Sequence, residues 1–112
     1  MRIGEFVKMV GTTMDTVRHY EQLGLIQPQR DKQYKDYSTE HVHAFEAISE
    51  FKSVGFTLDD IRLLFKLKES YGCGSPQLIQ DVAEQFTAQI DSLNQQIAVL
   101  EGRRDRLRGF LD

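Results

Sequence analysis

The apolar residues near the start of the chain recur at the spacing of an amphipathic helix: Ile3, Phe6, Val7 and Val10. This pattern predicts a short helix over residues 3–10, which a glycine ends. Thr12 or Thr13 can cap a second helix, in which Met14 and Val17 face the core. Two short helices joined by a tight turn that contains glycine predict a helix-turn-helix unit.

A polar stretch follows Pro28, which rules out a continuing helix. Tyr34 and Tyr37 favour a small pair of strands here, which would form a wing beside the helix-turn-helix. Two further helices are expected after the wing, the first capped by Ser38 and the second over residues 57–69. The second begins with a predicted capping box of Thr57 and Asp60, with aspartate where glutamate is usual. The apolar residues of both helices recur at helical spacing: Val42, Phe45, Ile48 and Phe51 in the first, and Ile61, Leu64 and Phe65 in the second.

The last third of the chain is predicted to form one long helix. Ser75 is the expected cap and Pro76 the first helical residue, and no further proline follows. At ~1.5 Å per residue this helix is roughly 55 Å long, which is more than one small domain can cover. Its apolar residues form two rows at heptad spacing: Ile79, Phe86, Leu93, Leu100 and Leu107 in one row, and Ala83, Ile90, Ile97 and Leu111 in the other.

A heptad seam of this kind is typical of a coiled coil. The helix at 57–69 is too short to cover five heptads, so we expect a second copy of the chain on the seam rather than an intramolecular hairpin. The arginines at 103–108 can pair with Asp81 and Glu84 of an antiparallel partner, or form a solvated cluster that a helix C-terminus favours. The expected interface residues are Ile79, Phe86, Ile90, Leu93, Ile97, Leu100 and Leu107.

These elements predict a mainly α fold. We expect a winged helix-turn-helix DNA-binding domain with a small β-wing over residues 1–70, and a hinge loop over residues 71–74. A long antiparallel coiled-coil dimerisation helix is expected over residues 75–112.

The net charge of −3 over 112 residues argues against a uniformly basic nucleic-acid-binding protein. A DNA-binding face therefore needs local segregation of charge. No apolar run is long enough to cross a bilayer, and the first residues do not form a signal peptide. We expect no membrane partner and a cytoplasmic location. The cations that can gather on one side are Arg2, Arg18, Arg30, Lys32, Lys35 and Lys52.

Residues that carry catalytic or metal chemistry are sparse in this sequence. The single cysteine, Cys73, excludes an internal disulfide and cannot build a zinc site alone. His41 and His43 are two residues apart and do not share a helix face. We find no nucleophile with a supporting base, no glycine-rich phosphate loop and no supported carboxylate pair. The prediction is a protein with no catalytic residues, no metal site and no cofactor.

Four segments together match the sequence pattern of a known protein family, in the same order and with the same spacing. They are residues 3–5, residues 16–26, residues 34–38 and residues 51–61. This set resembles the MerR family of bacterial transcription regulators, and the long helix falls where that family has its dimerisation helix. The resemblance covers essentially the whole chain. Two positions depart from the family pattern, because Lys35 stands where arginine is usual and His19 where tyrosine is frequent.

The resemblance implies a homodimer that binds double-stranded promoter DNA and distorts it, with RNA polymerase as a further partner at the promoter. It implies that Arg18 contacts a phosphate, for which its forked guanidinium is suited. Glu21 is expected to pair internally with Arg18 or with a wing residue. The residues expected at the DNA, from the second helix, the wing and their flanks, are Arg2, Thr13, Asp15, Thr16, Arg18, His19, Tyr20, Tyr34, Lys35, Tyr37 and Lys52.

The route by which an effector acts stays open. Metal-sensing members have a cysteine-containing loop after the dimerisation helix and drug-sensing members have a ligand-binding domain, whereas this sequence stops at Asp112. Cys73 can be a thiol sensor near a helix N-terminus or an inert loop cysteine. A groove near Phe65, Leu67 and Tyr71 is a further alternative. A winged-helix architectural or excisionase-like factor without an effector switch is the alternative function, and a coiled-coil adaptor leaves the wing unexplained.

Overall fold

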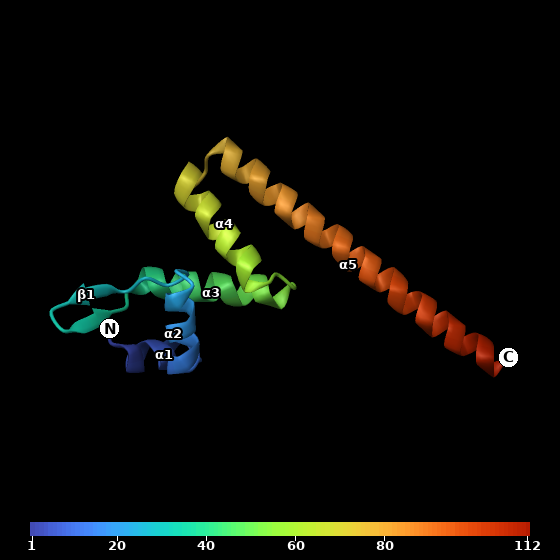
Figure 1. The fold of residues 1–112 in the computed structure, drawn as a ribbon, viewed down its shortest axis with the longest axis horizontal. Coiled ribbons are helices and arrows are strands. Elements are labelled where there is room, and N and C mark those ends of the chain that lie inside the picture. Colours follow the sequence, from blue (N-terminus) through green and yellow to red (C-terminus); the bar gives the residue numbers. More distant parts are fainter. The chain divides into compact units, whose positions relative to one another are not determined.

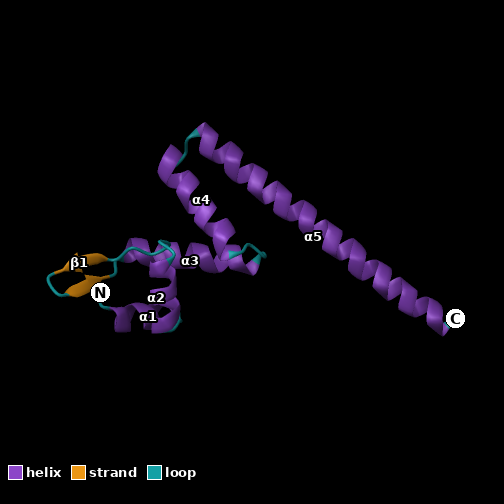
Figure 2. Cartoon of the chain, in the orientation of Figure 1, coloured by secondary structure: helices purple, strands orange, loops and turns teal.

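The computed structural model describes residues 1–112 as five helices and two strands. Figure 2 shows that helix predominates and that the only strands form one small hairpin, which confirms the predicted mainly α fold with a wing and a long last helix. In chain order (Figure 1) the elements are α1 (Ile3–Val10), α2 (Met14–Gln22), β1 (Gln29–Asp31), β2 (Tyr34–Asp36), α3 (Thr39–Ser53), α4 (Leu58–Tyr71) and α5 (Pro76–Leu111).

The chain divides into two compact units, Met1–Lys66 and Leu67–Asp112. The predicted DNA-binding domain ran to residue 70, whereas the first unit ends inside α4. Helix α4 continues across the boundary between the units. Packing against the first core therefore sets this boundary, and the glycine-containing loop at residues 71–74 does not.

The two helices of the helix-turn-helix are joined as the sequence predicts. Gly11 ends α1 at φ 72°, a left-handed conformation that favours glycine, and its N–H donates to the carbonyl of Val7. Thr13 is the cap of α2, because its hydroxyl oxygen accepts a hydrogen bond from the backbone N–H of Thr16. The prediction that Met14 faces the core is wrong. It is the first residue of α2 and lies outside the core, 41% exposed.

One apolar core holds the first unit together. Phe6 of α1 is fully buried, stacks on the ring of Tyr37 at 4.7 Å between centroids, and meets the ring of Phe45 edge-on at 6.3 Å. Such aromatic pairs contribute about 0.5–1.5 kcal/mol beyond the burial of their area. The other buried members of this core are Val17, Tyr20, Leu25, Ile26, Val42, Ile48, Phe56 and Ile61.

The wing is a two-stranded antiparallel hairpin in which Arg30 is paired with Lys35. Its tip is the two-residue turn of Lys32 and Gln33, and Lys32 adopts a positive φ of 57°. Every residue of both strands is exposed, so the hairpin has no apolar core of its own. A two-stranded hairpin alone is marginally stable in water, and the wing therefore depends on the contacts at its base.

Reciprocal hydrogen bonds begin α4, as the sequence predicts. The backbone N–H of Thr57 donates to the carboxylate of Asp60 at 2.9 Å, and the N–H of Asp60 donates to the Thr57 hydroxyl at 3.1 Å. This is a capping box with aspartate in the usual position of glutamate. In the second unit, the Ser75 hydroxyl accepts from the N–H of Leu78, and Pro76 is the first residue of α5, again as predicted.

Candidate nucleic-acid interface

The outer side of α2 presents polar and charged side chains. Arg18 Nη1 lies 3.7 Å from Asp15 Oδ1, and these side chains are 60% and 97% exposed. An ion pair this exposed contributes little to stability, so Arg18 can exchange the carboxylate for a phosphate at small cost. The hydroxyls of Thr13 and Thr16 lie 3.0 Å apart at the start of the helix, and His19 is exposed on its next turn.

A cationic pocket lies between α1, α2 and the wing. It has a volume of about 290 Å³, and four cations line it: Arg2, Arg18, Arg30 and Lys35. No carboxylate lines this pocket, although the chain carries a net charge of −3. Charge is therefore segregated locally, as a DNA-binding face requires. Sequence reasoning named Arg30 among the cations that can gather on one side but not among the DNA contacts, and it did not select Ile3 or Gln33. The place of Arg30 and Gln33 in the polar hairpin is the signal that could have found them.

Arg2 and Tyr34 bring the start of the chain to the wing. The guanidinium carbon of Arg2 lies 3.8 Å from the centroid of the Tyr34 ring, which is a close cation–π contact. Both residues line the cationic pocket, together with Gln33 at the tip of the hairpin. The two predicted contacts are thus placed side by side, and the ring supports a guanidinium whose donors stay available for an anion.

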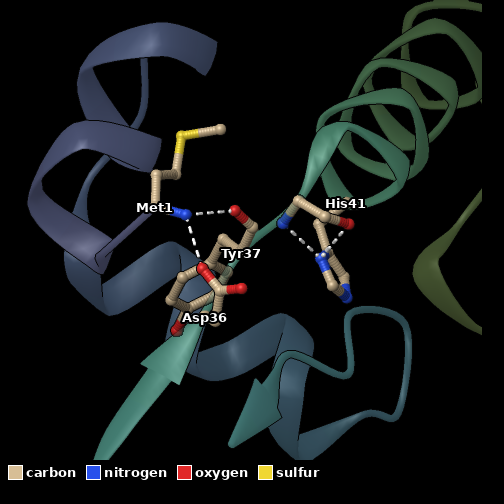
Figure 3. A network of polar contacts seen from close by, with 5 residues as sticks. Met1, Asp36, Tyr37 and His41 are labelled. Atoms are coloured by element: carbon tan, nitrogen blue, oxygen red, sulfur yellow. Dashed lines mark hydrogen bonds and ion pairs between the residues drawn. The ribbon is translucent and has the colours of Figure 1, made fainter. Parts of the chain in front are cut away.

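Figure 3 shows how the chain start is fixed. The α-amino group of Met1 donates to the carboxylate of Asp36 at 2.6 Å and to the carbonyl of Tyr37 at 2.7 Å. The N–H of Tyr37 donates in return to the Met1 carbonyl at 2.7 Å. The residue before Arg2 is therefore joined to the end of β2, which explains why Arg2 reaches the wing.

Glu21 connects α2 to the wing. One of its carboxylate oxygens, Oε1, accepts a hydrogen bond from the Tyr37 hydroxyl at 3.1 Å and lies 3.2 Å from the Lys35 ammonium. The internal partner expected for Glu21 is therefore a wing residue and not Arg18, which pairs with Asp15. Lys35, the predicted contact, is held at one end by this pair while its side chain remains 44% exposed.

The DNA contact expected of Tyr37 stays a prediction, and the structure gives this residue a role in the core although it also lines the cationic pocket. Its side chain has no exposed surface, because it lies in the core against Phe6. Burial, followed by the charge of Glu21 and the hydrogen bond to it, raises the pKa of Tyr37 to about 12. Arg18 acts in the opposite direction. Tyr37 therefore stays protonated and holds the end of the wing against α2.

Tyr20 and Lys52 form a second contact, between α2 and α3. The Lys52 ammonium donates to the Tyr20 hydroxyl at 3.4 Å, and the Tyr20 side chain is only 4% exposed. The ring is thus part of the core, and little of its surface can meet a phosphate. Lys52 is exposed and carries the charge at this point. The structure does not place Lys52 or Tyr20 in the cationic pocket.

The apolar seam of α5 is exposed along its whole length, since no residue of this helix is buried. Among the predicted interface residues, the exposed fraction runs from 38% for Phe86 and Leu93 to 66% for Leu107. Two further apolar residues that lie outside the predicted interface, Val99 and Phe110, are 52% and 75% exposed. They are off the heptad rows, which is why the periodicity did not select them.

The remaining candidate chemistry is limited. Cys73 is exposed and forms no disulfide, and its role as a thiol sensor stays a prediction. No group of three or more His, Cys, Asp or Glu side chains is placed to hold a metal ion. None of the helices is both long and apolar enough to cross a membrane.

Comparison with known proteins places this arrangement in a family. A family model described as "MerR HTH family regulatory protein" matches residues 1–68, and one described as "MerR, DNA binding" matches residues 42–110. The HTH-type transcriptional regulator HmrR of Rhizobium leguminosarum bv. viciae is 33% identical over 92 residues, which are 81% of this chain and 70% of that protein. The chain spans about half the length of two further relatives that it matches. These are the HTH-type transcriptional regulator ZntR homolog of Haemophilus influenzae and the mercuric resistance operon regulatory protein of Bacillus cereus.

Solved structures agree with these matches. The transcription regulator PbrR691 from Ralstonia metallidurans CH34, solved with lead(II), has a TM-score of 0.80 and 27% identity, covering 96% of this chain and 82% of that one. HiNmlR, a MerR family regulator lacking the sensor domain and bound to promoter DNA, has a TM-score of 0.65 over 95% of this chain and 82% of that one. Its identity of 21% shows the fold alone. An architectural or excisionase-like factor finds no support in these matches. The chain belongs to the MerR family of DNA-binding transcription regulators.

Proposed function

We propose that this regulator binds double-stranded promoter DNA with α2 in the major groove and the wing on the flanking backbone. The observation that carries the proposal is the cationic pocket, which four cations line in a chain of negative net charge. Two of them, Lys35 and Arg18, also pair with Glu21 and Asp15, which are not among the lining residues. A backbone phosphate fits this chemistry, because guanidinium groups bind phosphate oxygens in a forked geometry. The exposed side of α2, with Asp15, Thr16 and His19, then faces base edges.

The regulator acts as a homodimer joined through α5, in an antiparallel coiled coil. An exposed apolar seam at heptad spacing supports this assembly, since such a seam is stable in water only when another surface covers it. The acids Asp81 and Glu84 near the start of α5 and the arginines near its end favour antiparallel pairing.

Two-fold symmetry lets two recognition helices read two half-sites of one promoter, and distortion of the DNA between them adds specificity through its deformation energy. RNA polymerase is the expected partner at that promoter, in the cytoplasm. The role is one of binding, with no catalytic step, metal or cofactor assigned to the chain.

Selection from a pool of randomised duplexes tests the proposal. A symmetric dimer should enrich an inverted repeat whose half-sites are about one helical turn apart. Enrichment of no sequence, or of a single unrepeated half-site, would contradict the dimeric mode of binding.

The cationic pocket is tested by removing its wing cations. Changing Arg30→Gln together with Lys35→Gln should weaken binding to any duplex and lower the slope of log affinity against log salt by about one unit for each cation removed per subunit. Fluorescence anisotropy over a salt series measures this slope. Lys66→Gln, an exposed lysine of α4 outside the pocket, is the matched control and should bind like the wild type. An unchanged slope in the double variant would remove the pocket from the interface.

A further inference from the structure

The imidazole of His41 lies where the chain enters and leaves the wing. Its Nδ1 is 2.8 Å from the backbone nitrogen of Ser38, just after β2 (Figure 3). Its Nε2 is 2.8 Å from the carbonyl oxygen of Gln27, just before β1. One side chain therefore bridges two chain segments that are separated by the whole hairpin.

These contacts define the hydrogen-bonding role of each ring nitrogen, and the Ser38 hydroxyl also lies 3.0 Å from Nδ1. The backbone N–H of Ser38 donates, so Nδ1 of His41 accepts and carries no proton. The carbonyl of Gln27 can only accept, so Nε2 carries the proton and donates. The neutral ring has one donor and one acceptor, and both are used. The edge of the Tyr37 ring, 6.1 Å away between centroids, packs against it from the wing side.

We propose that His41 is a positioning residue for DNA binding, which clamps both ends of the wing so that its cations are held over the pocket. This inference rests on the proposed function. The strands are exposed and a lone hairpin is marginally stable. Arg30 and Lys35 sit opposite each other on that hairpin, and the other two pocket cations come from outside it. Preorganising the wing lowers the ordering cost of binding.

A purely local role for His41 is the alternative. His41 lies in the first turn of α3, and its contact with Ser38 satisfies a backbone N–H at the helix start. The contact with Gln27 is not part of the helix cap, and it joins α3 to the chain two residues before β1. The two contacts can be separated by substitution, because an asparagine side chain places an acceptor near the position of Nδ1 but is too short to reach Gln27, whereas alanine removes both contacts.

The experiment compares His41→Asn and His41→Ala. His41→Asn keeps the helix contact and loses the wing contact, so it should bind a mixed-sequence duplex about threefold to tenfold more weakly, the effect of roughly one hydrogen bond. His41→Ala loses both contacts and should bind as weakly as His41→Asn, with the lower melting temperature of a less well capped helix. The control is His43→Asn on the same helix, an exposed histidine outside the pocket, which should bind unchanged.

The proposal requires that the weaker DNA binding of His41→Asn depend on the wing cations Arg30 and Lys35. In the Arg30→Gln, Lys35→Gln background, His41→Asn should cost nothing further, since the charges that the clamp positions are absent. Equal weakening in both backgrounds, or wild-type affinity for His41→Asn, would overturn the proposal.

Amide hydrogen exchange of the free protein measures the effect of His41 on the wing in the absence of DNA. Exchange at residues 29–36 should accelerate to a similar extent in His41→Asn and His41→Ala. If the wild type binds no duplex, the proposed function fails while this measurement still decides the clamp. Unchanged exchange in His41→Asn would show that the wing does not need the bridge.

Discussion

The two units of this chain obtain their structure in different ways. In Met1–Lys66, buried side chains from four helices and from the end of the wing meet in one core. In Leu67–Asp112, α5 has no buried residue at all, although its sequence is as regularly patterned as any in the chain. Periodicity alone therefore does not create a core. The first unit covers its apolar surface internally, whereas the second leaves the apolar seam of α5 exposed.

This contrast has a thermodynamic consequence. The core of the first unit is formed by one chain, so we expect its stability not to depend on protein concentration. A coiled-coil seam gains its stability from a second chain, so its folding depends on concentration by mass action. The predictions below separate these two regimes.

The largest effect is expected on the seam. Changing Leu93→Glu and Leu100→Glu should dissociate the dimer, because each removes an apolar contact whose loss costs roughly 2–5 kcal/mol and adds a charge to the interface. Sedimentation equilibrium at micromolar concentration should give twice the chain mass for the wild type and the single mass for the variant. Gln95→Glu and Gln96→Glu add the same charge off the heptad rows and should leave the dimer intact.

A core truncation in the first unit should have the next largest effect. Phe6→Ala removes a fully buried ring that stacks on Tyr37, at a cost of about 3–5 kcal/mol in the free energy of unfolding of this unit. Urea unfolding followed by circular dichroism measures the loss, and DNA binding should fall with it. The mass in sedimentation should stay that of a dimer. Dissociation of the Phe6→Ala variant would mean that the two regions are not independent.

Arg18→Ala should produce a moderate change that is confined to the first unit. Removing one phosphate contact per subunit should weaken binding to all duplexes about equally and lower the salt slope by roughly one unit per subunit. Anisotropy titrations on several unrelated duplexes check this. If the variant instead loses preference at a single base pair, Arg18 reads sequence and its assignment to a phosphate is wrong.

The smallest effect concerns the Tyr37 hydroxyl. Burial raises its pKa from 10.0 to about 12, so the folded state keeps a proton that the unfolded chain releases. This group contributes its full stability below pH 10 and loses it as the pH rises toward about 12. Urea unfolding between these pH values should show a shallower decline for Tyr37→Phe than for the wild type. Tyr34→Phe, an exposed tyrosine, should follow the wild type, and identical curves for all three proteins would contradict the raised pKa.

Local patterns predicted the helices, the glycine at the end of α1, the caps at Ser75 and Thr57, and the position of the wing. They did not predict which distant residues meet. Tyr37 follows an exposed strand, so the local pattern indicates a surface residue, and only its stacking against Phe6 of α1 buries it. Glu21 could pair with any nearby cation, and its choice of Lys35 depends on how the hairpin folds back onto α2. Periodicity reports which face of an element is apolar and carries no information on long-range partners.

The tip of the wing also bears on protein engineering. Lys32 occupies a left-handed backbone conformation that glycine or asparagine adopts more readily. A designer seeking a stiffer hairpin would choose one of those residues and would lose a cation at the most protruding point of the β-ribbon. Thermal stability therefore favours glycine or asparagine at this position, whereas affinity for a polyanion favours lysine. Ranking variants by melting temperature alone would select against the positive charge.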